Sequence, residues 1–351
     1  MFAAQGRTDH NALVDFVDLS PRAQLRALRS VAATLPAAFG IEARRLRLIS
    51  QSYNATYRVD AADGRCFAMR ININSRRRPG ELLAEVSWVA ALSAAGTVQV
   101  PRPEPTVDGS YVAWTEVPSI DRPIPAVLYS WLDGRDLGGR PPAIQVRALG
   151  AAMARMHLQA AGWQLPPGAE LTPFDRPLLG DTRHIDEPHD LIDAGTRRTL
   201  AEAEEQAATV MRRLFDHGGR RIIHADLHGG NARWHRRQLS VFDFDDCLLG
   251  TPVEDLATSI YYLADRGPSE ALLKAGYESV TPLPPIAEGD LDALLAARNL
   301  LILNSLLLHT SPAMRNLLPA YLHNTVIKLR GYLDDGVYRH DHPGVDLVPF
   351  G

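Results

Sequence analysis

Hydrophobic positions recur along this chain with two different periods, that of a β-strand and that of an α-helix. The change of period divides the chain into parts. The segments RRLRLIS, ATYRVDA and RCFAMRINI, between residues 44 and 73, have the alternation of β-strands, and Asp63-Gly64 predicts a hairpin turn. YVAWTEV predicts a fourth strand, and the almost wholly apolar PAVLYSW predicts a fifth, central one. We therefore expect a small sheet over about residues 44–132.

Helical periodicity flanks this sheet and interrupts it once. SPRAQLRALRSVAATLPAAFG predicts a first helix, with Ser20 as N-cap and Gly40 beyond its end. ELLAEVSWVAALSAAG predicts a helix after the third strand, which Gly96 ends. After the polar loop LDGRDLGGRPP, the pattern predicts helices near residues 143–160, 196–217, 253–264, 289–308 and 312–333.

These elements predict an α+β protein with two lobes. We expect a helical extension over residues 1–40, a small lobe with an antiparallel sheet and one helix over 41–132, and a larger, mainly helical lobe over 133–351. Within the helical lobe, residues 222–246 are an exception, because they read as a strand, a loop and a short hairpin.

Composition narrows the class of protein. The 351 residues are 46% hydrophobic and 22% charged, with a net charge of −4, so a folded core is expected and a nucleic-acid partner is not. The two cysteines and the start of the chain indicate a cytoplasmic protein. LLAARNLLILNSLLLH is interrupted by Arg298 and Asn299, so we expect a core helix and no membrane partner. Arg76, Arg77 and Arg78 are expected in a solvated turn, with an anion contact as the alternative.

The stretch from Ile222 to Asp246, IIHADLHGGNARWHRRQLSVFDFDD, concentrates the ionisable residues. His224, Asp226 and Asn231 have the spacing H-x-D-x-x-x-x-N, and Asp243 follows on the second strand of the expected hairpin. A carboxylate that orients and deprotonates a hydroxyl, oxygen ligands for Mg²⁺ and a cation for phosphates are the requirements of phosphoryl transfer. The pattern therefore favours a phosphotransferase.

Each requirement has a candidate. We expect Asp226 to act as the base, and Asn231 and Asp243 to bind Mg²⁺. Asp245 is a weaker second ligand, because alternate side chains of a strand share a face. In the small lobe, Arg70 on its strand is expected to hold the phosphates, with Glu85 of the following helix paired to it.

The motifs resemble those of the aminoglycoside phosphotransferase/choline kinase superfamily, distant relatives of the protein kinases. HADLHGGN is similar to the catalytic loop H-x-D-x-H-x-x-N of that superfamily, VFDFDD to its metal-binding segment and PVEDLA to the motif that opens the next helix. YNATYRV, FAMRI, AEVSW and LYSWLDG follow the family's order of covering hairpin, phosphate strand, helix glutamate and hinge. Over residues 40–310 the likeness is closest to the group of stress response kinase A and type II homoserine kinases. FAMRI carries Arg70 where protein kinases have lysine, and the covering loop SQSYNATY contains no glycine.

The resemblance implies a kinase-like fold, ATP and Mg²⁺ as cofactors, and an acceptor with a hydroxyl group; GTP is the alternative nucleotide. The expected nucleotide-binding residues are Ser52, Asn54, Tyr129, Ser130, Trp131 and Leu132. His224 is expected to orient the catalytic loop, and Asp255 to brace it. His228 is expected either to support the loop or to contact the acceptor.

Several alternatives remain open from the sequence. The acceptor could be a small metabolite, which leads slightly, an aminoglycoside-type antibiotic, or Ser/Thr of a protein. The acidic loop 169–190 could form a wall of the acceptor site or be a solvated insertion. His224, Asp226 and His228 could instead form a transition-metal cluster, or the chain could be a nucleotide-binding pseudokinase. The oligomeric state is left open.

Overall fold

The computed structural model describes residue 16 and residues 19–51, 54–73, 75, 77–117, 119–179, 183–187, 189–263, 266–308 and 312–345. Its contacts divide the chain into two compact units, Met1–Arg76 with Pro103–Trp131, and Arg77–Arg102 with Leu132–Gly351. The first unit takes up the N-terminal helix, and the second takes up the helix that was expected in the small lobe. The contacts therefore do not divide the chain at residue 40, whereas one division, between Trp131 and Leu132, lies one residue from the expected boundary at 132.

The first unit is built on one antiparallel sheet with the order β1-β2-β3-β5-β4. Its strands are β1 (Ala43–Gln51), β2 (Ala55–Ala61), β3 (Cys66–Ile71), β4 (Ala113–Thr115) and β5 (Ile124–Ser130). β5 lies between β3 and β4, and six of its seven residues are buried, as its apolar sequence predicts. On β3, Arg70 pairs with Thr56 on one side and Val127 on the other, so its backbone is held in the centre of the sheet.

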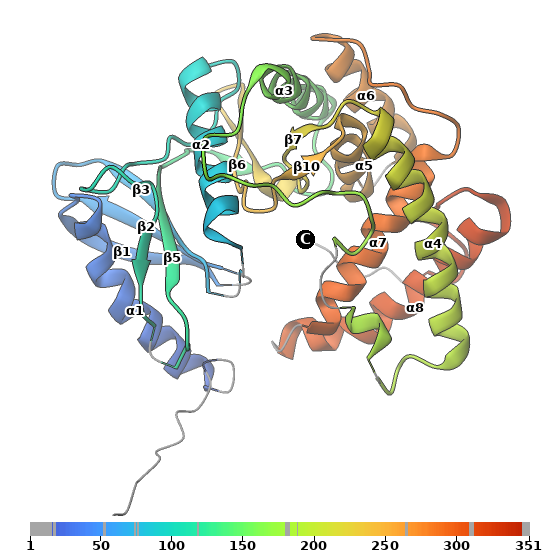
Figure 1. The fold of residues 1–351 in the computed structure, drawn as a ribbon, viewed down its shortest axis with the longest axis horizontal. Helices are drawn as coiled ribbons and strands as arrows, with labels where there is room; N and C mark the ends of the chain where they lie inside the picture. The colour runs from blue at the N-terminus through green and yellow to red at the C-terminus, as the bar shows by residue number, and fades with distance from the viewer. Residues whose placement is uncertain are drawn as a thin grey trace, which may run out of the picture. The chain divides into compact units, whose positions relative to one another are not determined.

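Helix α1 (Pro21–Ala38) packs on this sheet and completes its core. The side chain of Ser20 caps the helix by accepting a hydrogen bond from Ala23 N at 3.4 Å, as the sequence predicts. Leu28 and Leu35 are buried with strand residues such as Val59 and Met69. Figure 1 shows α1 running along the sheet.

The second unit is mainly helical and contains a few short strands. Its helices are α2 (Pro79–Ala95), α3 (Ala143–Gly162), α4 (Ala194–His217), α5 (Pro252–Tyr262), α6 (Arg266–Glu278), α7 (Asp290–Leu308) and α8 (Pro312–Asp335). Two 3₁₀ turns span His184–Asp186 and Gly229–Asn231. Its strands are β6 (Arg135–Asp136), β7 (Arg221–Ile223), β8 (Ala232–His235), β9 (Gln238–Val241) and β10 (Leu248–Gly250).

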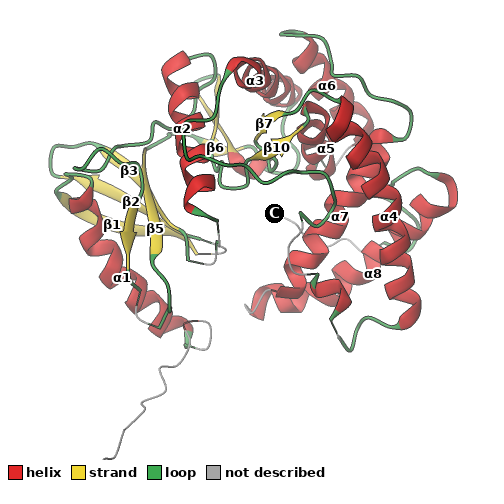
Figure 2. Cartoon of the chain, in the orientation of Figure 1, coloured by secondary structure: helices red, strands yellow, loops and turns green. Residues whose placement is uncertain are grey.

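The short strands hold the polar stretch in place between the helices. β7 pairs with β10 (Figure 2). β8 and β9 form a hairpin that β6 extends. The expected order of strand, loop and hairpin is therefore present, and the α+β prediction is confirmed.

Two helices of this unit need comparison with the sequence analysis. α6 was not expected, because Gly267-Pro268 resembles a break, although proline is accepted in the first turn of a helix. α7 is apolar and long enough to cross a membrane, with a mean hydropathy of 1.6 over its best window. However, 61% of that window is buried inside the protein, and Leu295, Leu300 and Leu303 are almost fully enclosed. α7 therefore serves as a core helix in this structure.

Candidate active site

Asp255, in the first turn of α5, fixes the start of the polar loop. Its two carboxylate oxygens accept hydrogen bonds from His224 N at 3.0 Å and Ala225 N at 2.7 Å, and Oδ2 also contacts His157 Nε2 at 2.9 Å. Burial disfavours the ionised form, but the His157 hydrogen bond and its neighbours outweigh burial and hold the pKa of Asp255 below its usual value. Ala225 has a positive φ of 63°, a strained backbone state for a non-glycine residue.

We expect Asp255→Asn to lower the free energy of unfolding by about 2–4 kcal/mol, because the amide cannot accept all three of these hydrogen bonds. Urea unfolding followed by circular dichroism measures the change, with the exposed Asp334→Asn as control. Since the pKa of Asp255 is depressed in the folded state, its contribution is present above about pH 4 and is lost as the pH falls further. A difference from wild type that is equal at pH 3 and pH 7 would contradict this account.

His224 links this loop to the segment that follows β9. Its Nδ1 accepts a hydrogen bond from Asp226 N at 3.3 Å, so Nε2 is the nitrogen that donates to Phe242 O at 3.0 Å. The side chain is fully buried, and burial lowers the pKa of His224 although Asp255 and Asp226 oppose the shift. His224 is therefore a neutral orienting residue whose two ring nitrogens are both occupied.

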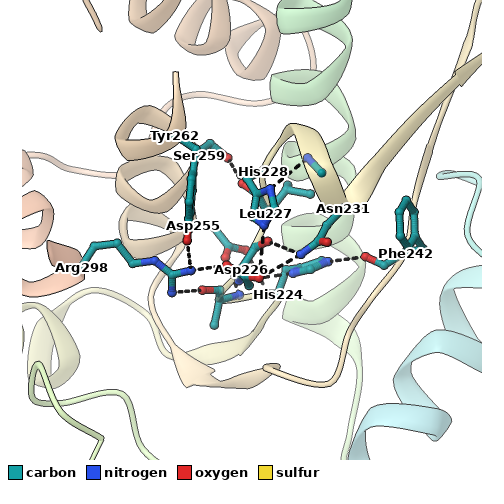
Figure 3. A network of polar contacts seen from close by, with 12 residues as sticks. His224, Asp226, Leu227, His228, Asn231, Phe242, Asp255, Ser259, Tyr262 and Arg298 are labelled. Atoms are coloured by element: carbon teal, nitrogen blue, oxygen red, sulfur yellow. Dashed lines mark hydrogen bonds and ion pairs between the residues drawn. The ribbon is translucent and has the colours of Figure 1, made fainter. Parts of the chain in front are cut away.

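Asp226 and Asn231 face each other across the loop (Figure 3). Asn231 Nδ2 donates to Asp226 O and to Asp226 Oδ2, both at 2.9 Å. Both bonds are made by Nδ2. Asn231 Oδ1 accepts no hydrogen bond from the described residues, so it is available as an oxygen ligand. Asn231 also donates its own backbone N–H to His228 O, which closes the 3₁₀ turn.

The segment carrying Asp243 is attached to the same loop at two points. Phe242 N donates to Asn231 O at 3.0 Å, and Phe242 O accepts from His224. The expectation that Asp243 lies on a strand is wrong, because β9 ends at Val241 and Asp243 has a φ of 65°, which a strand does not allow. Asp243 is exposed directly after this double attachment.

The same correction applies to Asp245. The argument that it shares a strand face with Asp243 fails, since both lie in the turn between β9 and β10. Arg77 braces this turn: its guanidinium donates to Asp245 O and, at 2.6 Å, to Cys247 O. Arg77 Nη1 also lies 3.8 Å from Glu85 Oε2. Arg77 is thus a largely enclosed contact of this turn and not the solvated residue that the sequence analysis expected.

His228 contributes mainly to the loop itself. Its Nδ1 accepts from Gly230 N at 2.9 Å, its Nε2 lies 3.4 Å from Asp226 Oδ2, and its ring lies 4.4 Å from that of Tyr262. Gly229 allows the loop to approach its neighbour, because a Cβ there would lie 2.1 Å from Gly138 O. An acceptor contact of His228 stays a prediction.

The sequence analysis missed Arg298 and Tyr262. Arg298 of α7 donates to Asp226 Oδ1 and to Tyr262 Oη, the latter at 2.8 Å. Burial would raise the pKa of Asp226, but Arg298 and then His228 outweigh it and hold that pKa at about 2. The signal was a lone arginine in an apolar helix, which was considered only as an interruption of a membrane span.

The candidate nucleotide residues lie mostly in the first unit. Arg70 is 6% exposed, its Nε donates to Asn72 Oδ1 at 2.9 Å, and its guanidinium lies 5.9 Å from the Tyr129 ring. Trp131 packs under Arg58, whose guanidinium lies 4.7 Å from the ring. The neighbouring candidates are Asn54, buried beside β2, and Ser130, at the end of β5. Leu132 begins a segment of the second unit, where its O accepts from Arg233, and Ser52 lies outside the described residues.

The chemistry of the donor set fits Mg²⁺ better than a transition metal. Asn231 Oδ1 and the carboxylate of Asp243 are oxygen donors, and Mg²⁺ commonly takes few protein ligands together with substrate phosphates. In the part of the chain that the structure describes, no three His, Cys, Asp or Glu side chains gather as a metal group. His224 has no free nitrogen for a metal, so the alternative H-x-D-x-H cluster is wrong.

Comparisons with known proteins agree with this geometry. Residues 45–287 match the sequence profile described as the phosphotransferase enzyme family. The fold is similar to a microcompartment-associated aminopropanol kinase, with 25% identity, a TM-score of 0.73, and coverage of 88% of this chain and 98% of that one. It is also similar to an amicoumacin kinase in complex with AMP-PNP, Ca²⁺ and Ami, with 18% identity, a TM-score of 0.66, and coverage of 87% and 95%. A putative fructosamine-3-kinase from Thermobifida fusca YX-ER1 has 21% identity, a TM-score of 0.54, and coverage of 87% and 99%. No curated protein sequence matches the chain.

Proposed function

Because the chain belongs to the phosphotransferase enzyme family and is a small-molecule phosphotransferase, we propose that it transfers the γ-phosphoryl group of ATP to a hydroxyl group of a small metabolite. The observation that carries this proposal is the pair of Asp226 and Asn231. One amide hydrogen-bonds the carboxylate that would receive the hydroxyl and leaves its own oxygen for a metal. Asp243 supplies the anionic ligand, because Phe242, the residue before it, is hydrogen-bonded to the same loop.

The residues then have distinct roles. Asp226 accepts the hydrogen bond of the acceptor hydroxyl and takes its proton while the acceptor oxygen bonds to the γ-phosphorus and the bond to the β,γ-bridging oxygen breaks, leaving ADP. Asn231 Oδ1 and Asp243 would hold Mg²⁺, which neutralises charge on the phosphates when bound. His224 and Asp255 keep the loop in place, so little reorganisation is needed during the reaction.

We assign the nucleotide to the set of Arg70, Asn54 and the hinge residues 129–132. Arg70 is a buried, permanently charged side chain on a central strand, which suits a phosphate. ATP is the nucleotide we propose, and a competition experiment with GTP tests this choice. The similarity to a kinase bound to AMP-PNP supports nucleotide use at the level of the fold.

The charges of the second unit favour a small acceptor over a polycationic antibiotic. An aminoglycoside needs unpaired acidic groups, but Asp175 pairs with Arg176 at 2.9 Å, and Arg183 pairs with both Asp186 and Glu204. Asp226, the proposed base, itself pairs with Arg298. The similarity to an aminopropanol kinase supports a short amino alcohol as the first acceptor to test.

ADP formation with Mg²⁺-ATP across a panel tests the acceptor. The panel contains 1-amino-2-propanol and other amino alcohols, simple sugars, homoserine, kanamycin, spectinomycin and casein. We expect the largest stimulation from an amino alcohol or another small metabolite. Stimulation by kanamycin alone, or by casein alone, would overturn the proposed acceptor class. Nucleotide binding without any turnover, including hydrolysis, would favour the pseudokinase instead.

A double-mutant cycle tests the expected pair of Arg70 and Glu85. If Glu85 orients Arg70 towards the phosphates, Arg70→Ala should raise the KM for ATP, and adding Glu85→Ala should cost little more. Arg70→Lys should keep part of the activity, because it retains the charge without the planar fork. The measurement is kcat/KM for ATP in all four combinations.

Arg77 provides the matched comparison, since it is the cation seen 3.8 Å from Glu85. A cycle of Arg77→Gln with Glu85→Ala should be non-additive in the free energy of unfolding, as expected for buried partners. Fully additive losses of kcat/KM in the Arg70 cycle would show that Glu85 serves Arg77 alone. The phosphate cation would then have to be sought at Arg58 or Arg76.

A further inference from the structure

Arg298 is a charged residue in the middle of helix α7, whose other charged residues, Asp290 and Asp292, lie in its first turn. It lies 72 positions after Asp226, and only 10% of its side chain is exposed. Its Nη2 serves both Asp226 Oδ1 and Tyr262 Oη, and its Nη1 lies 3.4 Å from Ala225 O. Its guanidinium carbon also lies 5.2 Å from the centre of the Tyr262 ring. Arg298 therefore contacts the loop through the side chain of Asp226, the proposed base, and through the backbone before it.

The contacts of Arg298 close a ring of four side chains that includes Asp226, and all four are labelled in Figure 3. Asp226 contacts Arg298, Arg298 contacts Tyr262, the Tyr262 ring packs on His228, and His228 Nε2 returns to Asp226. Three elements meet in this ring, namely α7, α5 and the loop after β7. Because each member is held by two others, the plane of the Asp226 carboxylate is fixed from both sides.

A count of hydrogen-bond sites shows what remains for a substrate. An ionised carboxylate offers about four acceptor sites, two on each oxygen. Asn231 Nδ2 and His228 Nε2 lie against Oδ2, and Arg298 takes one site of Oδ1. The site left for an acceptor hydroxyl is therefore on Oδ1, the oxygen whose direction Arg298 sets.

Stability alone gives a poor account of this arginine. Its Nε is buried and has no hydrogen-bond partner among the described residues, and a buried unsatisfied donor destabilises the folded state. Buried ion pairs are often no more stabilising than apolar residues of similar volume. An apolar side chain would also match the rest of α7, such as Leu294 and Leu301 on neighbouring turns.

We propose that Arg298 is a positioning residue for phosphoryl transfer, which directs Asp226 Oδ1 at the acceptor hydroxyl. Through Tyr262, it also holds the side chains next to that oxygen. The inference rests on the proposed function. Misplacing a reacting group by about 1 Å can cost 10²-fold in rate. Arg298→Met should therefore lower kcat by about 10²-fold per folded molecule. The KM for ATP should change by less than about threefold, since Arg298 contacts the base and not the nucleotide.

Three further variants separate positioning from structural support. Arg298→Lys keeps the charge but not the fork, and should recover at least about tenfold of the lost kcat. Arg213→Met is the matched control, because Arg213 pairs with Asp290 at the start of the same helix and lies outside the ring. It should alter the free energy of unfolding without altering kcat. In an Asp226→Asn background, Arg298→Met should add almost no further loss, because the two residues act as a unit.

The experiment measures kcat, the KM for ATP and urea unfolding for each variant. The reactions are Mg²⁺-ATP with the best acceptor of the panel, and Mg²⁺-ATP hydrolysis by water alone. A wild-type protein without either activity would refute the proposed function and not the role of Arg298. A kcat of Arg298→Met within threefold of wild type, or equal losses in the Met and Lys variants, would overturn the inference. If the Met variant does not fold, Arg298→Lys and Tyr262→Phe decide: unchanged kcat in both would overturn it.

Discussion

Asp226→Asn is expected to lower kcat by about 10²–10⁴-fold while the Kd for ATP changes by less than about threefold. The amide keeps the size of the side chain, but it can neither take a proton nor balance the charge of Arg298. Asp226 contacts Asn231, His228 and Arg298, so the loss should fall on the acceptor step. The measurements are steady-state ADP formation and the binding of a fluorescent ATP analogue.

Two controls are needed to interpret this result. Circular dichroism and urea unfolding establish that the variant folds, since removing one partner of a buried ion pair can cost about 3–5 kcal/mol. The double variant Asp226→Asn with Arg298→Met removes the uncompensated guanidinium, and so keeps the prediction testable if the single variant is unstable. Turnover comparable to wild type in either folded variant would rule out Asp226 as the base.

Asp243→Ala should reduce kcat/KM for ATP by about 10³-fold and abolish the dependence of nucleotide binding on Mg²⁺. The reason is that Asp243 is the anionic oxygen donor on the segment that Phe242 attaches to the catalytic loop. Isothermal titration with ATP at several Mg²⁺ concentrations measures the loss. Because the left-handed φ of Asp243 disfavours alanine, Asp243→Asn is the variant that separates charge from backbone strain.

Asp245→Ala is the matched comparison for the metal. It removes a carboxylate two positions away in the same turn, and we expect a loss several times smaller than that of Asp243→Ala. A larger loss at Asp245 would exchange the roles of the two residues. Zinc that copurifies in stoichiometric amount and disappears in the His228→Ala variant would contradict the Mg²⁺ assignment altogether.

The local parts of the fold could be predicted because their signals are local. Ser20 caps α1 and Gly96 ends α2 in the left-handed conformation, and both effects arise within one turn of helix. The alternation in β2 and the apolar run of β5 gave the sheet, since burial on one or both faces selects those patterns. α6 was missed because Gly267-Pro268 gives the same signal at the start of a helix as in a loop.

The candidate site divides in the same way. Asp226 and Asn231 lie five positions apart on one loop, so their spacing alone could suggest that they meet, and Nδ2 of Asn231 does contact Asp226 Oδ2. The roles assigned to them, and to Arg70, Glu85 and Asp243, stay predictions. The conformation of Asp243 could not be predicted, because its positive φ accompanies two hydrogen bonds of Phe242 to the preceding loop, at Asn231 and His224.

The sequence by itself determined the α+β class, the order of the elements apart from α6 and some short strands, and the loop that carries the phosphotransferase motif. Only the tertiary structure decided which charges oppose each other there. Arg298 reaches Asp226 across 72 positions, and Arg77 reaches Cys247 across 170. Periodicity shows that a helix face is buried, but not which loop that face meets. The partner of a buried charge depends on how helices and loops pack, and that geometry is set by all the contacts of the core together.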